Sequence, residues 1–237
     1  MAKLKGPVKP ARPYRSAGRD QQARATRRAV VAAATRLFVE RGYGVTTIDA
    51  IAAKAKVSRA TVFASVGGKA DVLKAAYDIA LVGDVEPAAL PDRPESRRVI
   101  AEADAARMLR GYAAISTAVS GRVAPMYEAV RGAAGTDSGG RAIWDKVRAE
   151  RRIGARNVIR LVEERGSLRA GLGADKAADI VFAFNDPGLY HLLVRDRGWE
   201  IETFEAWLAK TLSQQLLAPA ARRLHGSPAN LRMEEQL

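Results

Sequence analysis

The chain has 237 residues, of which 48% are hydrophobic, so it can bury a substantial core and wholesale disorder is excluded. It contains no cysteine, which excludes disulfides, thiolate metal sites and thiol nucleophiles. Its net charge of +13 is concentrated in residues 1–75, where 16 Lys and Arg face four acids, a net charge of +12.

This one-sided charge favours a polyanionic partner, either nucleic acid or an anionic membrane surface, although a solvated basic tail would show it too. No apolar run reaches the roughly 18 residues that a membrane span needs. The basic N-terminal residues are followed by no apolar segment of the kind found in secretory signals. We therefore expect a cytoplasmic protein with no membrane contact.

Residues 1–22 combine three prolines with scattered cations and predict a disordered basic arm. Helical spacing of apolar residues then predicts a helix over 22–41, ended by Gly42. Its start carries Arg24, Arg27 and Arg28, which the helix dipole disfavours unless a phosphate supplies negative charge. The arm itself fits two alternatives equally well, namely contact with DNA or a merely solubilising tail.

Three short helices follow. Thr46, with an acid three residues later, predicts the start of a short helix with Ile48 and Ile51 on its inner stripe. Ser58 predicts the cap of the next helix, 59–66, and a further helix is expected over 69–83. Two short helices joined by a tight turn and preceded by a basic helix indicate a helix-turn-helix, although an ordinary three-helix bundle gives the same pattern.

The second of these two helices suits a DNA major groove because its exposed side chains are short. Val62 and Val66 are expected to face inward, with Arg59, Ala60, Thr61, Ala64 and Ser65 outward. Arg59 can bind guanine, Ala60 can contact a thymine methyl, and Thr61 and Ser65 can bind a base or a phosphate. Lys69 begins a helix and indicates a phosphate contact.

Three prolines between residues 86 and 94 mark a connection, and the chain beyond it is helical in pattern, without strands. We thus expect an all-α protein divided into an arm (1–22), a helix-turn-helix DNA-binding domain (23–84), a larger helical domain (85–218) and a loose tail (219–237). Helices in the larger domain are expected over residues 95–101, 104–120, 123–133, 141–165, 175–185, 187–195 and 201–218.

Residues 24–77, and more loosely the whole chain, resemble the tetracycline-repressor (TetR) family of bacterial transcription regulators. The resemblance lies in 34–38 with Gly42 and Tyr43, in 46–52, in 57–63 and in 68–73. It implies a homodimer that binds a palindromic operator in double-stranded DNA, usually as a repressor released by a small molecule. The full set of DNA-binding residues that we expect is Arg27, Thr46, Thr47, Ser58, Arg59, Ala60, Thr61, Phe63, Ser65 and Lys69.

Within that set the resemblance assigns Thr46, Thr47 and Lys69 to the DNA backbone and places residues 58–61 at the start of the recognition helix. Phe63 stands where the family usually has tyrosine, so a phosphate-binding hydroxyl is missing. Lys56 occupies a turn position where the family often has glycine, and a positive φ there would cost on the order of 1 kcal/mol.

By the same resemblance, the region after residue 86 binds the small molecule and the second subunit. Aromatic and methionine side chains at helical spacing are candidates for the pocket, although such residues also form ordinary cores: Met108, Tyr112, Met126, Tyr127, Trp144, Phe182, Phe184 and Asn185. The last two helices carry more apolar surface than a helix pair hides alone, which predicts a four-helix dimer interface unless they pack within the chain. The interface candidates are Tyr190, Leu193, Phe204, Trp207, Leu208 and Leu212.

Two other kinds of function are weighed against this one. An enzyme is disfavoured because the two histidines lie far apart and residues 67–70 lack the spacing of a phosphate-binding loop. We therefore expect no catalytic residues, no metal site and no cofactor. The alternative is a protein that binds nucleic acid or anionic surfaces without sequence preference and uses its basic arm to do so.

Overall fold

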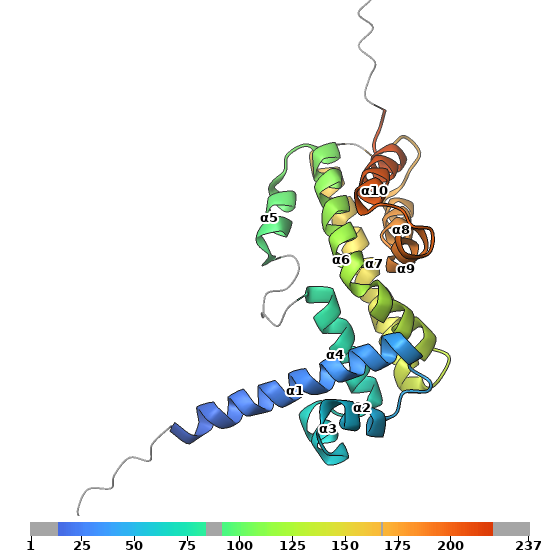
Figure 1. The fold of residues 1–237 in the computed structure, drawn as a ribbon. Coiled ribbons are helices and arrows are strands. Elements are labelled where there is room, and N and C mark those ends of the chain that lie inside the picture. The colour runs from blue at the N-terminus through green and yellow to red at the C-terminus, as the bar shows by residue number, and fades with distance from the viewer. Residues whose placement is uncertain (1–13, 84–91, 167, 220–237) are drawn as a thin grey trace, which may run out of the picture.

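The computed structural model describes residues 14–83, 92–166 and 168–219 of the chain, which form helices joined by short turns (Figure 1). No β-strand occurs in these ranges, apart from an isolated bridge between Leu168 and Leu217, so the expected all-α class is confirmed. The N-terminal helices are α1 (Tyr14–Arg41), α2 (Ile48–Ala55), α3 (Arg59–Ser65) and α4 (Lys69–Val82). The remaining helices are α5 (Pro94–Ala101), α6 (Ala105–Ala133), α7 (Ser138–Arg165), α8 (Ala174–Phe184), α9 (Pro187–Tyr190), the π-helical turn η2 (His191–Asp196) and α10 (Ile201–Leu216).

Short polar side chains fix where most of these helices begin. The hydroxyl of Thr47 accepts from the amide of Ala50 at the start of α2, and the carboxylate of Asp71 accepts from the amide of Gly68 at the start of α4. Asp104 and Asp137 cap α6 and α7 in the same way. Each such cap satisfies a backbone amide that would otherwise have no partner within the helix.

Two sequence predictions about helix extent were wrong. A disordered arm was expected to reach residue 22, but α1 already begins at Tyr14; the rest of the predicted arm, 1–13, lies outside the described residues, as do residues 220–237 of the predicted tail. Separate helices were expected over 104–120 and 123–133, but α6 is continuous and includes Pro125. Its buried side chains lie on both sides of that proline, so packing along the whole length holds the helix together.

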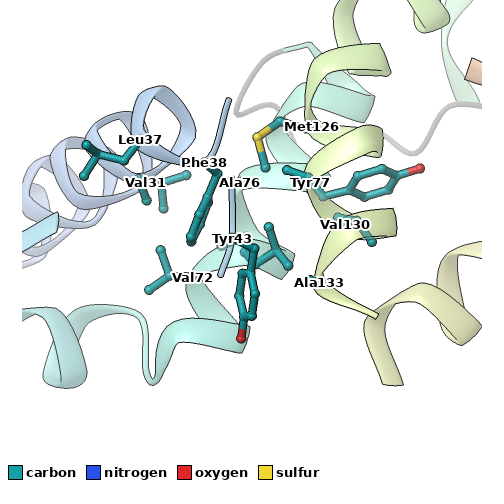
Figure 2. Close-up of a cluster of buried hydrophobic side chains, with 14 of the residues drawn as sticks. Val31, Leu37, Phe38, Tyr43, Val72, Ala76, Tyr77, Met126, Val130 and Ala133 are labelled. Atoms are coloured by element: carbon teal, nitrogen blue, oxygen red, sulfur yellow. The ribbon is translucent and has the colours of Figure 1, made fainter. Parts of the chain in front are cut away.

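The N-terminal helices share one hydrophobic core with the adjoining ends of α6 and α7. Leu37 and Phe38 of α1 and Val72 and Ala76 of α4 are buried against Met126, Val130 and Ala133 of α6, as Figure 2 shows. Val62 of α3 and Ile51 of α2 complete the core beneath the turn that joins those helices. The helix-turn-helix is therefore supported directly by the larger, C-terminal part of the chain.

A second core lies at the other end of α6 and α7, where α8, α9 and α10 pack. Met108 and Leu109 of α6 and Ile159 of α7 contact this group, and α10 contributes Phe204, Leu208, Leu212 and Leu216. The turn between α8 and α9 is built by Asp186, whose carboxylate accepts from the amide of Gly188, followed by Pro187 in the first position of α9. Proline suits that position because its missing N–H would have no partner there.

Candidate DNA-binding surface

The turn between α2 and α3 is closed by Lys56 in a left-handed conformation, with φ 57° and ψ 42°. Lys56 stands at a turn position where the resembling family often has glycine, and its φ is positive, as that position suggested. A residue with a Cβ is disfavoured there by about 1 kcal/mol. The tight turn is therefore built at some cost in stability, and it sets the angle at which α3 follows α2.

Ser58 then begins α3, as predicted, since its hydroxyl accepts from the amide of Thr61 at 3.0 Å. The hydroxyls of the two residues also lie 2.8 Å apart and share a hydrogen bond. Both groups are thus held at the N-terminus of α3, where the helix dipole favours an anion.

The outer face of α3 is open to solvent, whereas Val62 is fully buried beneath it. Arg59, Ala60 and Ala64 are exposed, Thr61 and Ser65 are half-buried, and Phe63 is 46% exposed. The predicted orientation is confirmed for Val62, which faces inward, and for Arg59, Ala60 and Ala64, which face outward, whereas Thr61, Ser65 and Val66 are partly buried. With Ala60 and Ala64 on this face, little side chain stands between the helix backbone and an approaching surface.

Arg59 is paired with Asp49 of α2, a contact that the sequence did not indicate. Its Nη1 atom lies 2.8 Å from Oδ2 of Asp49, and its guanidinium lies 5.7 Å from the centre of the Phe63 ring. Both charged side chains are more than half exposed, at 60% and 67%. Ion pairs of this kind contribute only about 0.2–1 kcal/mol, so Arg59 can exchange this partner for another at little cost.

The two threonines before α2 differ in role, and the prediction for one of them was wrong. Thr46 is 1% exposed, and its hydroxyl donates to the carbonyl of Gly42 at 2.8 Å, so it fastens the α1–α2 turn and cannot reach a nucleotide. Thr47 is the exposed cap of α2. The helix start predicted at Thr46 is therefore displaced by one residue.

Arg27 connects α1 to α3. Its Nη1 atom donates to the carbonyl of Ser65 at 2.9 Å, and the side chain is exposed. N-terminal to it, residues 18–24 of α1 are all exposed and include Arg24, and Figure 1 shows these turns of the helix projecting beyond α2 and α3. The positive charge of α1 therefore continues the surface that α3 presents.

Lys69, at the start of α4, is held by groups that are remote in sequence. Its Nζ atom donates to the carbonyl of Gly44 at 3.2 Å and lies 4.1 Å from the centre of the Tyr43 ring. The Tyr43 hydroxyl in turn donates to Asp137 at 2.9 Å, at the cap of α7. Burial lowers the pKa of Lys69, and the nearby Asp137 opposes that effect.

The same cluster ties the helix-turn-helix to α7. Burial and the hydrogen bond to Asp137 raise the pKa of Tyr43, so its hydroxyl keeps its proton. A Cβ atom added at Gly139 would lie only 2.9 Å from the Cβ of Ala70. This short distance shows how closely α7 approaches α4. Sequence reasoning missed Tyr43 and Asp137; the aspartate in a glycine-rich segment was a visible capping signal, but its partner 94 residues away was not.

A separate cavity of about 500 Å³ lies between α4, α5, α6, α7 and the α8–α9 turn. Three of the eight predicted pocket residues line it, namely Met108, Tyr112 and Asn185. The other five do not, because they pack elsewhere: Met126 in the first core, Tyr127 against Trp144, Phe182 beneath the guanidinium of Arg151, and Phe184 against Trp207. Tyr77 and Leu81 of α4 also line the cavity, so one helix contacts both the cavity and the helix-turn-helix core.

Arg151 was missed as a cavity residue, although the sequence carried a signal for it. It stands in the inward-facing stripe of α7 that Val147, Ala155 and Val158 otherwise fill with apolar side chains. A charge in such a stripe needs a partner when it is buried. Here Asp186 supplies that partner, 2.8 Å away.

The predicted dimer interface was wrong for four of its six residues. Tyr190, Phe204, Leu208 and Leu212 are at most 3% exposed within the single subunit, because α10 and α9 pack against α6. The alternative of packing within the chain holds for these four. Leu193 and Trp207 are half-buried and keep part of their surface accessible.

Among residues 14–83, 92–166 and 168–219, no group of three or more His, Cys, Asp or Glu side chains could hold a metal ion. No helix in those ranges is both long and apolar enough to cross a bilayer.

Comparison with known proteins gives two kinds of match. Residues 30–76 match the family described as "Bacterial regulatory proteins, tetR family", and no curated protein matches the chain by sequence. The fold resembles NalD of Pseudomonas aeruginosa, the secondary repressor of the MexAB-OprM multidrug efflux pump, with a TM-score of 0.62 and 18% identity over 86% of this chain and 100% of that one.

Two further structures with this fold contain small molecules. A regulator from Saccharomonospora viridis in complex with choline has a TM-score of 0.58 and 19% identity, over 80% of this chain and 96% of that one. FadR of Bacillus subtilis in complex with stearoyl-CoA has a TM-score of 0.58 and 15% identity, over 78% and 96%. Residues 30–76 of this chain thus match the tetR family model, and the described helices share the overall fold of these solved regulators.

Proposed function

We propose that this chain regulates transcription by placing α3 in the major groove of double-stranded DNA. The observation that carries the proposal is the outer face of α3, where one long cation, Arg59, stands with the short exposed side chains of Ala60 and Ala64 and the exposed ring of Phe63. Arg59 would bind a guanine through two hydrogen bonds, and Ala60 and Phe63 would contact thymine methyl groups. The weak pairing of Arg59 with Asp49 supports this role, since little energy is lost when the pair opens.

Residues around α3 would hold the DNA backbone. Thr47 and Ser58 carry hydroxyls at exposed helix starts, and Arg27 lies beside the C-terminal end of α3. Lys69 would add a further cation for the phosphates once its hydrogen bond to the carbonyl of Gly44 is broken. The charge of +12 in residues 1–75 supports binding to phosphates over this whole surface.

We propose further that two copies bind a palindromic site. Leu192 is 50% exposed, and Leu193 and Trp207 remain half-buried, so an apolar face is left on the last helices after the subunit has folded. Large apolar residues that stay accessible favour association with a second copy. Sedimentation at micromolar concentration should give a dimer of about twice 25.5 kDa, and a monomer would contradict this part of the proposal.

Repression with release by a small molecule is the mode of regulation that we propose. One relative is named as a repressor, and two are described with choline and stearoyl-CoA bound. In this chain, α4 forms part of the cavity wall through Tyr77 and Leu81 and part of the helix-turn-helix core through Val72 and Leu73. A molecule that displaces α4 would therefore change the position of α3.

Selection of bound sites from random duplexes, followed by sequencing, tests the function directly. A two-fold symmetric consensus is expected, and Arg59→Ala should weaken binding to it by about 1–3 kcal/mol while relaxing one base position. Arg156→Ala is the matched control, because Arg156 is an exposed cation on α7 that pairs with Asp175 of α8. Selection that yields no consensus, or equal affinity for mixed-sequence DNA, would contradict the proposal.

A further inference from the structure

The cavity is lined mainly by apolar residues, such as Val99, Ile115 and Val119 from α5 and α6. Ser96, Ser116, Ser120 and Asn157 add small uncharged polar groups to the lining, and the end formed by Tyr112, Arg151 and Asn185 is its polar end. At the polar end, the side-chain amide of Asn185 donates to the hydroxyl of Tyr112. Burial raises the pKa of Tyr112 and of Tyr77, so both phenols in the lining stay neutral.

The positive charge of Arg151 at this end is already neutralised. Nη1 of Arg151 lies 2.8 Å from Oδ2 of Asp186 and donates to the Tyr127 hydroxyl at 3.0 Å. Nη2 donates to the carbonyl of Phe182 at 2.7 Å and to Oδ1 of Asn185 at 3.1 Å. Three of the N–H groups on the two Nη atoms thus donate hydrogen bonds, and the ion pair with Asp186 compensates the charge. A ligand carboxylate would have to compete with Asp186 for this guanidinium.

The other charged residues of the lining are also paired, and they face water. The side chain of Arg160 is 64% exposed and lies 2.8 Å from Glu164. That of Glu150 is 50% exposed and lies 3.8 Å from Lys146. The buried part of the cavity therefore offers no unpaired carboxylate to a cation and no unpaired cation to an anion.

We infer that the cavity takes an uncharged, largely apolar molecule with one hydrogen-bonding group, which faces Tyr112 and Asn185. A charged ligand would lose its hydration without gaining an opposite charge, and such a loss is costly inside a protein. The inference rests on the proposed function only in treating this ligand as the effector. It names a class of ligand different from the choline and the stearoyl-CoA of the two relatives.

The test uses three probes that share a ten-carbon chain, namely 1-decanol, decanoate and decyltrimethylammonium. Each is titrated into the full chain by calorimetry at pH 8, with 1-decanol below its solubility limit and the two charged probes below their critical micelle concentrations. 1-Decanol should bind at least about tenfold more tightly than either charged probe, because only the charged probes lose hydration without compensation. Tighter binding of decanoate or of the ammonium probe, or no binding of any of the three, would overturn the inference.

Charge variants at the polar end sharpen the result. Asp186→Asn keeps an N-cap for α9 but removes the counter-charge of Arg151, so decanoate should gain about tenfold or more in affinity while 1-decanol changes little. Asp179→Asn is the matched control, since Asp179 is an exposed carboxylate of α8 that pairs with Arg152 outside the cavity lining. An equal gain in the two variants would refute the role of the Arg151–Asp186 pair.

A second variant covers the case in which Asp186→Asn does not fold. Asn185→Asp adds a negative charge at the same end, so it should raise the affinity for decyltrimethylammonium and leave decanoate the weakest of the three probes. An affinity for decyltrimethylammonium that does not rise in this variant would also contradict the inference. Since calorimetry contains no DNA, these outcomes are independent of site selection, and either proposal can fail while the other stands.

Discussion

The pairing of Arg59 with Asp49 leads to a quantitative prediction for DNA affinity. The two side chains are 2.8 Å apart and more than half exposed, so the pair is worth about 0.2–1 kcal/mol. This energy must be given up when Arg59 turns to a base. Asp49→Asn removes the competing charge with almost no change in shape, and it should tighten binding to the selected site by about 1.4- to 5-fold.

The assay is fluorescence anisotropy with the selected duplex at fixed salt, on wild type, Asp49→Asn, Arg59→Ala and the double variant. Arg59→Ala should weaken binding by about 5- to 160-fold, which corresponds to about 1–3 kcal/mol. In the double variant, the gain from Asp49→Asn should disappear, because there is no longer an arginine to release.

Two results would refute the reasoning. If Asp49→Asn strengthened binding equally with and without Arg59, the carboxylate would act by repelling phosphates and not by holding the arginine. If Arg59→Ala weakened binding to mixed-sequence DNA as much as to the selected site, Arg59 would contact the backbone and not a base. Urea unfolding of each variant controls for a loss of stability at the start of α2.

Three further perturbations follow from the same surface. Lys56→Gly should raise the free energy of unfolding by about 0.5–1 kcal/mol, because glycine tolerates the left-handed turn, and a lower melting temperature would contradict this. Arg24→Ala combined with Arg28→Ala should reduce the slope of log K against log salt by as much as about 1.8; an unchanged slope would show that this part of α1 does not touch phosphates. Tyr43→Phe should lower the free energy of unfolding in urea by about 0.5–1.5 kcal/mol through loss of the hydrogen bond to Asp137, whereas Asp137→Asn, which keeps an acceptor and a cap, should lose less; the reverse order would contradict the role given to that bond.

Features encoded by neighbouring residues could be predicted from the sequence. The cap at Ser58, the buried position of Val62 and the positive φ of Lys56 each depend on a few adjacent residues or on the period of a helix. These local features suffice to define the helix-turn-helix. The displacement of the α2 cap from Thr46 to Thr47 shows the limit, since two adjacent threonines offer the same chemistry and only the packing of the turn distinguishes them.

Features that depend on contacts between distant segments could not be predicted in this way. The hydrogen bond from Tyr43 to Asp137 joins residues 94 positions apart, and Arg151 binds partners on α6, α8 and the α8–α9 turn. Four of the six predicted interface residues were wrong for the same reason: the apolar stripe with Phe204 and Leu208 was visible, but a stripe does not say whether its own chain or a second copy covers it. The apolar composition of a helix face predicts that the face is buried. Which segment buries it depends on how the helices are arranged in the folded chain.

Because α1 and α4 share a core with α6, we expect that the N-terminal helices cannot fold when they are separated from α6. A fragment ending at Val82 would lose Met126, Val130 and Ala133, and their former partners Phe38 and Ala76 would be left against water. Grafting residues 14–82 onto another protein should therefore yield an insoluble or unfolded product unless the end of α6 is transplanted with them. By the same logic, a substitution deep in α6 should abolish the proposed operator binding without lying anywhere near a nucleotide.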